Sequence, residues 1–359
     1  MKAVIIAGGL GTRLRPLTYN TPKPIVPVAN RPFVVHQIEL LKQHGIDEII
    51  INLHYLSDSI KKILDDGREW GIKIRYSIEK NPLGTAGAVK NAEEYFKDEE
   101  LIVVFNGDIL TDANISEIIK FHKAKNAVAT LTLTPVEDPT SYGLVLCDRD
   151  GRVLEFIEKP SWERVEGIAR KNINAGIYIL DPKIFKDIKS GTSVMFEHHV
   201  FPSLLQKGLP VYGFESNAYW IDIGNPEKYR QAHQAILRGD VTLVKIFGRR
   251  EKGGIWMGEQ VEVDKTAKIF GPSIIGEKVR LEANSSIREY TVIGNRVVVG
   301  NGSSIDNSII WDGSRIGSNV RLSGCIIGFN CKIEDGVSIL KGGVIADNTV
   351  ISKGTNFSA

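Results

Sequence analysis

Up to about residue 240, apolar runs of strand length alternate with stretches whose apolar residues recur at helical spacing. The strand-like runs cover residues 4–7, 48–53, 72–78, 101–106 and 127–133. Amphipathic stretches at residues 33–45 and 115–126 lie between them. This alternation predicts an α/β domain with a Rossmann-like, mostly parallel sheet and helices on both faces.

A second pattern replaces the first beyond residue 240. Branched aliphatic residues at spacings of 18, 17, 17 and 18 occupy Ile275, Ile293, Ile310, Ile327 and Ile345. Six residues on from each lie Leu281, Val299, Ile316, Ile333 and Ile351, and twelve on from the first four lie Ile287, Ile305, Leu322 and Ile339. Val263 and Ile269 extend the register backwards. Three apolar positions per turn of about 18 residues predict a three-sided parallel β-helix. We expect it to be a left-handed β-helix of hexapeptide repeats. Antiparallel strands with coincidental spacing are the alternative.

The change of pattern predicts a first domain over residues 1–240, a linker over 241–260 and a β-helix domain over 261–359. The 45 basic and 43 acidic residues leave a net charge of +2, so no overall field recruits nucleic acid or a membrane surface. The three cysteines include no CxxC pair, which favours a reduced, cytoplasmic compartment. No segment approaches the roughly 18 apolar residues of a membrane span.

The segment AGGLGTRLRPLTYNTPKP follows the first predicted strand. It is not a dinucleotide fingerprint, because Leu14 stands where the third glycine belongs, and it is not a Walker A loop, because Thr12 and Arg13 follow Gly11. Its prolines favour a long, defined loop, which is usually functional. We expect its amides to receive an anion, with Arg13 and Lys23 as explicit charges. A glycine-rich turn with cations facing solvent is the alternative.

Two carboxylates could hold a divalent ion. Asp108 ends an apolar strand in VVFNGDIL, and Asp222 lies between isoleucines in YWIDIGNP. Either alone could be a helix cap or an ion-pair partner. Together with the opening loop they favour a Mg²⁺ site, since hard oxygens and phosphate share such an ion.

A third cluster lies in FIEKP and NINAGIYIL. Lys159 offers a point charge for a phosphate, and Glu158 and Asn174 offer a carboxylate and an amide for hydroxyl groups. These residues suit a sugar phosphate. A snorkelling surface lysine and a simple turn are the alternatives.

In order along the chain, the motifs are GGLGTRLRPLTYNTPKP, PLGTAGAV, NGD, EKP, NAGIYI and WIDIG, followed by hexapeptide coils. With these motifs the chain resembles the sugar-1-phosphate nucleotidyltransferase family over essentially its whole length. The resemblance implies catalytic roles on phosphate for Arg13 and Lys23. It implies nucleotide contacts by Gly8, Gly9, Gly11, Thr12, Glu79, Gly84 and Thr85. It implies sugar-phosphate contacts by Gly143, Glu158, Lys159 and Asn174, and Mg²⁺ ligation by Asp108 and Asp222.

The resemblance implies in-line attack of a sugar-1-phosphate oxygen on the α-phosphorus of a nucleoside triphosphate, with release of pyrophosphate. The nucleophile is already an anion, so catalysis is positioning and charge neutralisation. The carboxylate of Glu79 favours GTP, because guanine offers two adjacent donors while uracil and thymine suit an amide. A surface salt bridge between Glu79 and Lys80 is the alternative. Mannose-1-phosphate as the sugar rests on the resemblance alone, and a glucose-1-phosphate thymidylyl- or uridylyltransferase remains open.

Two rival functions are weaker. A β-helix acyltransferase normally uses a histidine base, but the seven histidines all precede the coils. A regulatory relative without turnover would be expected to have lost Arg13, Lys23 or a metal aspartate, and all are present. The flat faces and coil ends of a β-helix favour assembly into a homo-oligomer.

Overall fold

The structure is a computed structural model that describes residues 1–357. It contains two compact units. The first unit comprises Met1–Gly9 and Val34–Ile221, and the second comprises Leu10–Phe33 and the residues from Asp222 onward. The boundaries predicted from sequence (1–240, 241–260 and 261–359) stay predictions, and residues 358 and 359 lie outside the described residues.

The first unit is built on a nine-stranded sheet with the order β10-β9-β11-β6-β1-β4-β5, in which β8 pairs with β11 and β12 pairs with β8. Its strands are β1 (Lys2–Ile6), β4 (Glu48–Leu53), β5 (Lys73–Ile78), β6 (Ile102–Asn106), β8 (Ala129–Pro135), β9 (Gly143–Cys147), β10 (Val153–Glu158), β11 (Asn172–Leu180) and β12 (Val211–Glu215). The short strands β7 (Ile109–Thr111) and β13 (Trp220–Asp222) lie outside this sheet.

The predicted α/β sheet is confirmed, with one addition. Strand β1 pairs in parallel with β4 and β6, and β4 pairs in parallel with β5. Beyond β6 the sheet is mixed: β11 runs against β6, β8 and β9, and β9 runs against β10, whereas β12 pairs in parallel with β8. The connection between β9 and β10 is too short for the crossover that a parallel pair needs. Sequence periodicity reports strands but not their direction.

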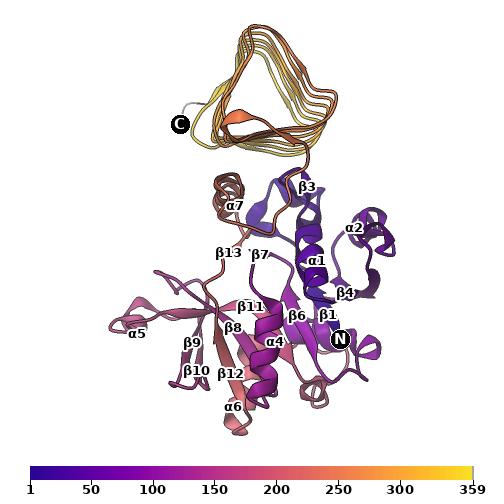
Figure 1. Ribbon diagram of the computed structural model, residues 1–359, viewed down its shortest axis with the longest axis vertical. Helices are drawn as coiled ribbons and strands as arrows, with labels where there is room; N and C mark the ends of the chain where they lie inside the picture. Colours follow the sequence, from indigo (N-terminus) through magenta and orange to yellow (C-terminus); the bar gives the residue numbers. More distant parts are fainter. Residues whose placement is uncertain (358–359) are drawn as a thin grey trace. The chain divides into compact units, whose positions relative to one another are not determined.

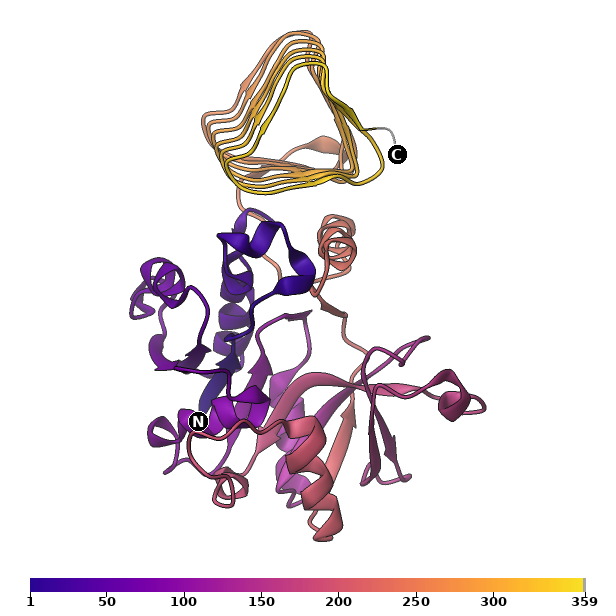
Figure 2. The same ribbon diagram turned by 180° about the vertical axis from the view of Figure 1, so that it is seen from behind.

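The helices of the first unit are α1 (Phe33–Gln43), α2 (Ser57–Leu64), α3 (Gly84–Asn91), α4 (Ile115–Ala124), α5 (Trp162–Val165) and α6 (Phe201–Gln206). Its shorter turns are η4 (Arg68–Trp70), η5 (Glu93–Tyr95), η6 (Pro182–Phe185) and the π-helix η7 (Phe196–Val200). Figure 1 shows α4 in front of the sheet, and Figure 2, seen from behind, brings α6 to the front. The sheet is therefore covered on both faces, as predicted, and many of its buried aliphatic and aromatic residues, among them Val104, Leu131 and Tyr178, form a core cluster.

The coils of the second unit form a three-sided parallel β-helix, visible as a triangle in Figure 1. One side contains β14 (Arg249–Arg250), β15 (Ile255–Met257), β18 (Ser273–Ile275), β21 (Thr291–Ile293), β24 (Ile309–Ile310), β27 (Ile326–Ile327) and β30 (Val344–Ile345). The next contains β16 (Glu262–Val263), β19 (Arg280–Leu281), β22 (Val298–Val299), β25 (Arg315–Ile316), β28 (Lys332–Ile333) and β31 (Val350–Ile351). The last contains β17 (Lys268–Ile269), β20 (Ser286–Ile287), β23 (Ser304–Asp306), β26 (Arg321–Ser323), β29 (Ser338–Ile339) and β32 (Asn356–Phe357).

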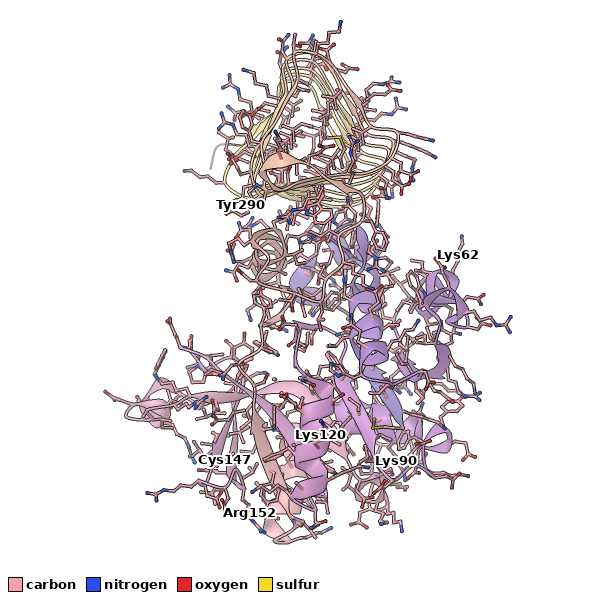
Figure 3. All side chains as sticks on the ribbon, in the orientation of Figure 1. Lys62, Lys90, Lys120, Cys147, Arg152 and Tyr290 are labelled. Atoms are coloured by element: carbon pink, nitrogen blue, oxygen red, sulfur yellow. The ribbon has the colours of Figure 1, made fainter. Side chains whose placement is uncertain are left out.

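The predicted inward residues stack in register. Ile275 pairs with Ile293, Ile293 with Ile310, and Ile310 with Ile327. The same aliphatic columns form a continuous buried core through the triangle, while nitrogen- and oxygen-tipped side chains project outward in Figure 3. The β-helix prediction is confirmed, because the inward residues of successive coils are buried together, whereas a neighbouring outward residue such as Arg280 is exposed.

The rest of the second unit is irregular or helical. Residues Leu10–Phe33 contain η1 (Thr12–Leu14), η2 (Leu17–Tyr19), η3 (Lys23–Ile25) and the hairpin of β2 (Pro27–Val28) with β3 (Arg31–Pro32). After β13 come α7 (Pro226–Arg238) and η8 (Lys252–Gly254). Figures 1 and 2 both show α7 and the segment around β3 beside the same side of the triangle. Within residues 1–357, none of the helices has the length and apolar character of a membrane-spanning segment.

Candidate active site

The first unit places Glu79 beside the glycines that follow β1. A Cβ atom on Gly8 would lie 2.9 Å from Oε1 of Glu79, so a side chain there would push the carboxylate out of this position. Glu79 is 6 % exposed, and its Oε2 accepts a hydrogen bond from the Leu83 amide at 3.0 Å. Burial raises the pKa of Glu79, although the Leu83 amide and His54 oppose the shift. Glu79 is therefore a buried side chain, which argues against the surface salt bridge with Lys80. Of the other predicted nucleotide contacts in this loop, Gly9 is exposed.

The turn that opens α3 is tied to the π-helix. Thr85 donates from Oγ1 to Oε2 of Glu197 at 2.9 Å and accepts from the Phe196 amide at 2.9 Å. A Cβ atom on Gly84 would lie 2.7 Å from the Val194 carbonyl oxygen. The hydroxyl of Thr85 therefore orients Glu197, a residue that our sequence analysis missed. A π-helix is often found at a functional site, but the FEHHV stretch carries no sequence signal for it.

Gly143 and Glu158 lie opposite each other on β9 and β10. A Cβ atom on Gly143 would lie 3.0 Å from Oε2 of Glu158. The Glu158 side chain is 20 % exposed, whereas Lys159 is 68 % exposed and its Nζ lies 3.8 Å from Oε1 of Glu158. The pKa of Glu158 is raised, first by burial and then by Glu197, while Lys159 and His198 lower it. The structure thus brings Gly143, Glu158 and Lys159 together, with Glu197 close enough to act on Glu158.

Asn174 lies in an irregular part of β11, where the register with β8 shifts before Tyr178. Its Nδ2 donates to the Tyr178 hydroxyl at 2.8 Å, and its Oδ1 accepts from the Gly176 amide at 3.1 Å. Bulges of this kind redirect side chains beside functional sites. Each polar atom of Asn174 keeps one further hydrogen-bonding position for a ligand.

Asp108 follows the end of β6 and is half-buried. The residue before it is still tied to the neighbouring strand, because the Gly107 amide donates to the Ile6 carbonyl of β1 at 2.9 Å. Nearby in the chain, Oδ1 of Asn106 is buried without a hydrogen-bond partner. This end of β6 therefore presents a carboxylate and an unsatisfied amide oxygen.

In the second unit, the opening loop folds so that Lys23 lies on Gly11. Gly11 has φ of 61°, and a Cβ atom there would lie 3.4 Å from Cβ of Lys23. Thr18 donates to the Gly11 carbonyl at 2.7 Å and fixes this fold. A left-handed conformation so close to another side chain requires glycine. The loop is thus a defined structure, as predicted.

Arg13 and Asp222 approach the same glycine in this unit. A Cβ atom on Gly224 would lie 3.1 Å from Nη2 of Arg13 and 2.6 Å from Oδ2 of Asp222. Asp222 is 6 % exposed and forms an ion pair with Lys228 on α7. Thr12, which begins η1, is exposed. Lys228 was also missed, because nothing in NPEKYR distinguishes it from a surface lysine of a helix.

Asp108 and Asp222 each present a carboxylate, the kind of ligand that suits a magnesium ion arriving with a phosphate. Such an ion is usually bound by one or two carboxylates, with substrate oxygens and water as the remaining ligands. The part of the chain that the structure describes contains no cluster of three or more His, Cys, Asp or Glu residues that could hold a metal ion. The two carboxylates belong to different compact units.

Comparison with known families agrees with this chemistry. Residues 2–239 match the model of the nucleotidyl transferase family. Residues 252–357 match the left-handed β-helix domain described as the EIF2B subunit epsilon LbH domain. The chain belongs to the nucleotidyl transferase family, and its sequence motifs are those of the sugar-1-phosphate nucleotidyltransferases.

Individual relatives are similar along most of their length. The chain is 35 % identical to UTP–glucose-1-phosphate uridylyltransferase of Synechocystis, over 94 % of this chain and 90 % of the relative. It is 34 % identical to mannose-1-phosphate guanyltransferase of Candida albicans, over 99 % of this chain and 94 % of the relative. Among solved structures, HddC of Yersinia pseudotuberculosis complexed with GMP-PN is 32 % identical, with a TM-score of 0.55 over 64 % of this chain and 97 % of that chain.

Proposed function

We propose that the chain transfers a guanylyl group from GTP to mannose-1-phosphate and forms GDP-mannose and pyrophosphate. The proposal deepens the nucleotidyl transfer that the family defines. It is supported by the Candida relative, whose name is mannose-1-phosphate guanyltransferase, and by HddC, whose structure contains GMP-PN.

The observation that carries the choice of base is the geometry of Glu79. One carboxylate oxygen accepts the Leu83 amide, and the other faces Gly8 in the loop that follows β1. Because the side chain is held on one side, it presents a fixed acceptor. Guanine offers two adjacent donors to such a carboxylate, whereas uracil offers one donor between two acceptors.

In the proposed reaction, a phosphate oxygen of mannose-1-phosphate attacks the α-phosphorus of GTP. A new P–O bond forms, the bond between the α-phosphorus and the bridging oxygen breaks, and pyrophosphate leaves with the electron pair. No proton has to be transferred, because the attacking oxygen is already an anion. Arg13 and Lys23 stabilise the charge on the phosphates, while Glu158 and Asn174 accept and donate hydrogen bonds to sugar hydroxyls and Lys159 binds the sugar phosphate.

Magnesium is part of the proposal. Asp108 and Asp222 would hold the ion, which when bound neutralises charge on phosphate oxygens. The fit is chemical: two carboxylates suit an ion whose other ligands come from the substrate. We expect chelation by EDTA to abolish transfer and Mg²⁺ to restore it. Asp108→Asn should lower kcat at least about 100-fold, and activity that survives both changes would exclude a metal role.

The second candidate is a uridylyltransferase that uses glucose-1-phosphate. The Synechocystis relative, at 35 % identity, carries that name. In that case Glu79 would not read the base, and Glu79→Gln would leave the order of nucleotides unchanged.

The deciding experiment measures pyrophosphate release with GTP, UTP, dTTP, ATP and CTP, each with mannose-1-phosphate and with glucose-1-phosphate. We expect the highest kcat/KM for GTP with mannose-1-phosphate. Highest turnover with UTP or dTTP and glucose-1-phosphate would contradict the substrate assignment and keep the reaction. No turnover with any pair would contradict the reaction itself.

We also propose that the protein is cytoplasmic and forms a homo-oligomer through the β-helix. Exposed apolar side chains lie at both ends of the coils: Val263 and Phe270 in the first, and Val350 and Phe357 in the last. Unpaired strands at a coil end favour association with another copy. Light scattering should give more than one copy per particle, and a monomer would contradict this proposal.

A further inference from the structure

The segment that contains Lys23 is anchored to the β-helix within the second unit. We call residues 21–31 the Lys23 segment. Thr21 donates from Oγ1 to Oδ2 of Asp347 at 2.8 Å. At the other end, Asn30 donates from Nδ2 to the Ile293 carbonyl at 2.8 Å. Both acceptors belong to β-helix coils, so both ends of the Lys23 segment are tied to the coils.

Asp347 makes one contact that the coils require and a second that they do not. Its Oδ1 accepts the Phe329 amide at 2.8 Å. Asp335 does the same for the Ser318 amide at 2.8 Å, and Asn295 for the Glu277 amide at 2.8 Å. This shared contact belongs to the repeat. The hydrogen bond from Thr21 uses the other oxygen of Asp347, which the repeat leaves available.

A second anchor passes through the middle of the Lys23 segment. In the position after each inward isoleucine, the coils carry Gly276, Gly294, Trp311, Gly328 and Ala346. Trp311 is the large exception and is 1 % exposed. It donates from Nε1 to the Tyr229 hydroxyl at 3.0 Å, and that hydroxyl donates to the Pro27 carbonyl. The indole thus reaches the Lys23 segment through a buried tyrosine of α7.

These anchors bear directly on Lys23. Thr21 is 6 % exposed and precedes Lys23 by two residues, with Pro22 between them at φ of −63°. Because proline fixes the backbone there, the position of Thr21 sets the direction in which the chain continues to Lys23. Lys23 in turn packs on Gly11. A Cβ atom placed on Gly11 would lie 3.4 Å from Cβ of Lys23.

We propose that Asp347 is a positioning residue for nucleotidyl transfer, and that Trp311 supports it through Tyr229. The β-helix serves as a template that holds Lys23 where the phosphates of the nucleotide are bound. This inference rests on the proposed function. Misplacement of a charge by about 1 Å at a phosphate can cost up to about 100-fold in rate.

The test is a double-mutant cycle on Thr21 and Asp347, measured as separate KM values for GTP and mannose-1-phosphate. Thr21→Val and Asp347→Ala should each raise the KM for GTP about tenfold and change the KM for the sugar phosphate less than about twofold. The double variant should also show about a tenfold increase, because both changes remove one contact. An increase near 100-fold, or equal changes for both substrates, would overturn the proposal.

Two further variants separate positioning from stability. Asp335→Ala removes the same kind of coil contact, so we expect a thermal midpoint similar to that of Asp347→Ala and unchanged KM values. Asp347→Asn keeps an oxygen for the Phe329 amide and an amide group for Thr21, so it should stay within about threefold of the wild type. A KM for GTP that rises equally in Asp335→Ala would show that only coil stability matters.

Trp311→Phe tests the second anchor, because it keeps a ring and removes the Nε1 donor. We expect about a threefold increase in the KM for GTP. An unchanged KM would remove Trp311 from the proposal.

Hydrogen exchange tests the inference even if the wild type transfers no nucleotide. The amides of Ile25 and Val26 donate to the carbonyls of Pro22 and Lys23. Their exchange should be at least about tenfold faster in Asp347→Ala than in the wild type and Asp335→Ala. Absence of turnover in the wild type would contradict the proposed function alone. Equal exchange rates in all three proteins would contradict the proposal that Asp347 anchors the Lys23 segment.

Discussion

Two pairs of candidate site residues, one pair from each unit, differ in charge and in burial. The first unit contributes the carboxylates of Glu79 and Glu158, both shielded from water and both with a raised pKa. The second unit contributes Arg13, which is exposed, and Lys23, which is half-buried on Gly11. The first set is acidic and fixed by neighbours, and the second is basic and carried by an irregular loop.

This difference separates recognition from catalysis. A buried carboxylate rejects a ligand that leaves it without a donor, so it discriminates between bases or sugars. A cation on a phosphate contributes charge, and phosphates are common to every nucleoside triphosphate. The two carboxylates of the first unit should therefore decide which base and sugar are accepted, and the two cations of the second should decide how tightly any triphosphate is held and how fast it reacts.

The largest effect is expected from Arg13→Ala. Loss of the guanidinium removes charge stabilisation in the transition state, so kcat should fall about 1,000-fold. The fall should be similar for GTP and UTP, measured as pyrophosphate release. Arg13→Lys keeps a charge but loses the planar fork, and should recover part of the rate. A loss confined to one nucleotide would contradict the inference that Arg13 acts on phosphates and not on the base.

Glu158→Gln should give the next largest effect. The amide keeps the shape of the side chain and removes the charged acceptor for sugar hydroxyls, so kcat/KM for mannose-1-phosphate should fall about 30-fold. The KM for GTP should stay within about twofold. Glu197→Gln is the matched variant, since Glu197 acts on Glu158 and also binds Thr85. A larger change for GTP than for the sugar would contradict the assignment.

The sequence predicted the β-helix and the loop for different physical reasons. Each inward residue, from Ile275 to Ile345, must avoid water, so the apolar positions repeat with the period of the coils. The loop was recognised by glycines and prolines, which restrict the backbone even without a regular pattern. Both signals are local, and both were read correctly.

Contacts between residues distant in the chain could not be read in this way. Thr85 and Glu197 are separated by 112 positions, and Thr21 and Asp347 by 326. A threonine or a carboxylate has the same local appearance whether or not it has such a partner. Trp311 is the exception, because a large residue stands in a column of glycines and alanine, and that break in a repeat is a signal of an outside contact.

A smaller effect is expected from Glu79→Gln. The amide suits the donor and acceptor edge of uracil better than the two donors of guanine, so the ratio of kcat/KM values for GTP and UTP should fall about tenfold. Gln should keep the contact with the Leu83 amide through its oxygen, which makes the change conservative for folding. Parallel changes for both nucleotides would show that Glu79 does not read the base.

The smallest expected effect is a pH dependence of base recognition, with no matching dependence of phosphate binding. Burial raises the pKa of Glu79 above its usual value of 4.5, against the opposing effects of the Leu83 amide and His54. As the pH falls through this raised pKa, the carboxyl takes up a proton and can no longer accept two donors from guanine. The KM for GTP should therefore increase about threefold on the acidic side, and the KM for UTP should change less, because a protonated carboxyl can donate to uracil.

The measurement compares KM values for GTP and UTP from about pH 8 to about pH 5 in the wild type and in Glu79→Gln. Gln does not titrate, so the variant should lose the difference between the nucleotides. If the variant retains the GTP-specific increase, another group causes it, and base recognition does not depend on the ionisation of Glu79. If the increase disappears with the carboxylate, the charge on one buried side chain accounts for the preference between GTP and UTP, while the cations of the second unit act on both nucleotides alike.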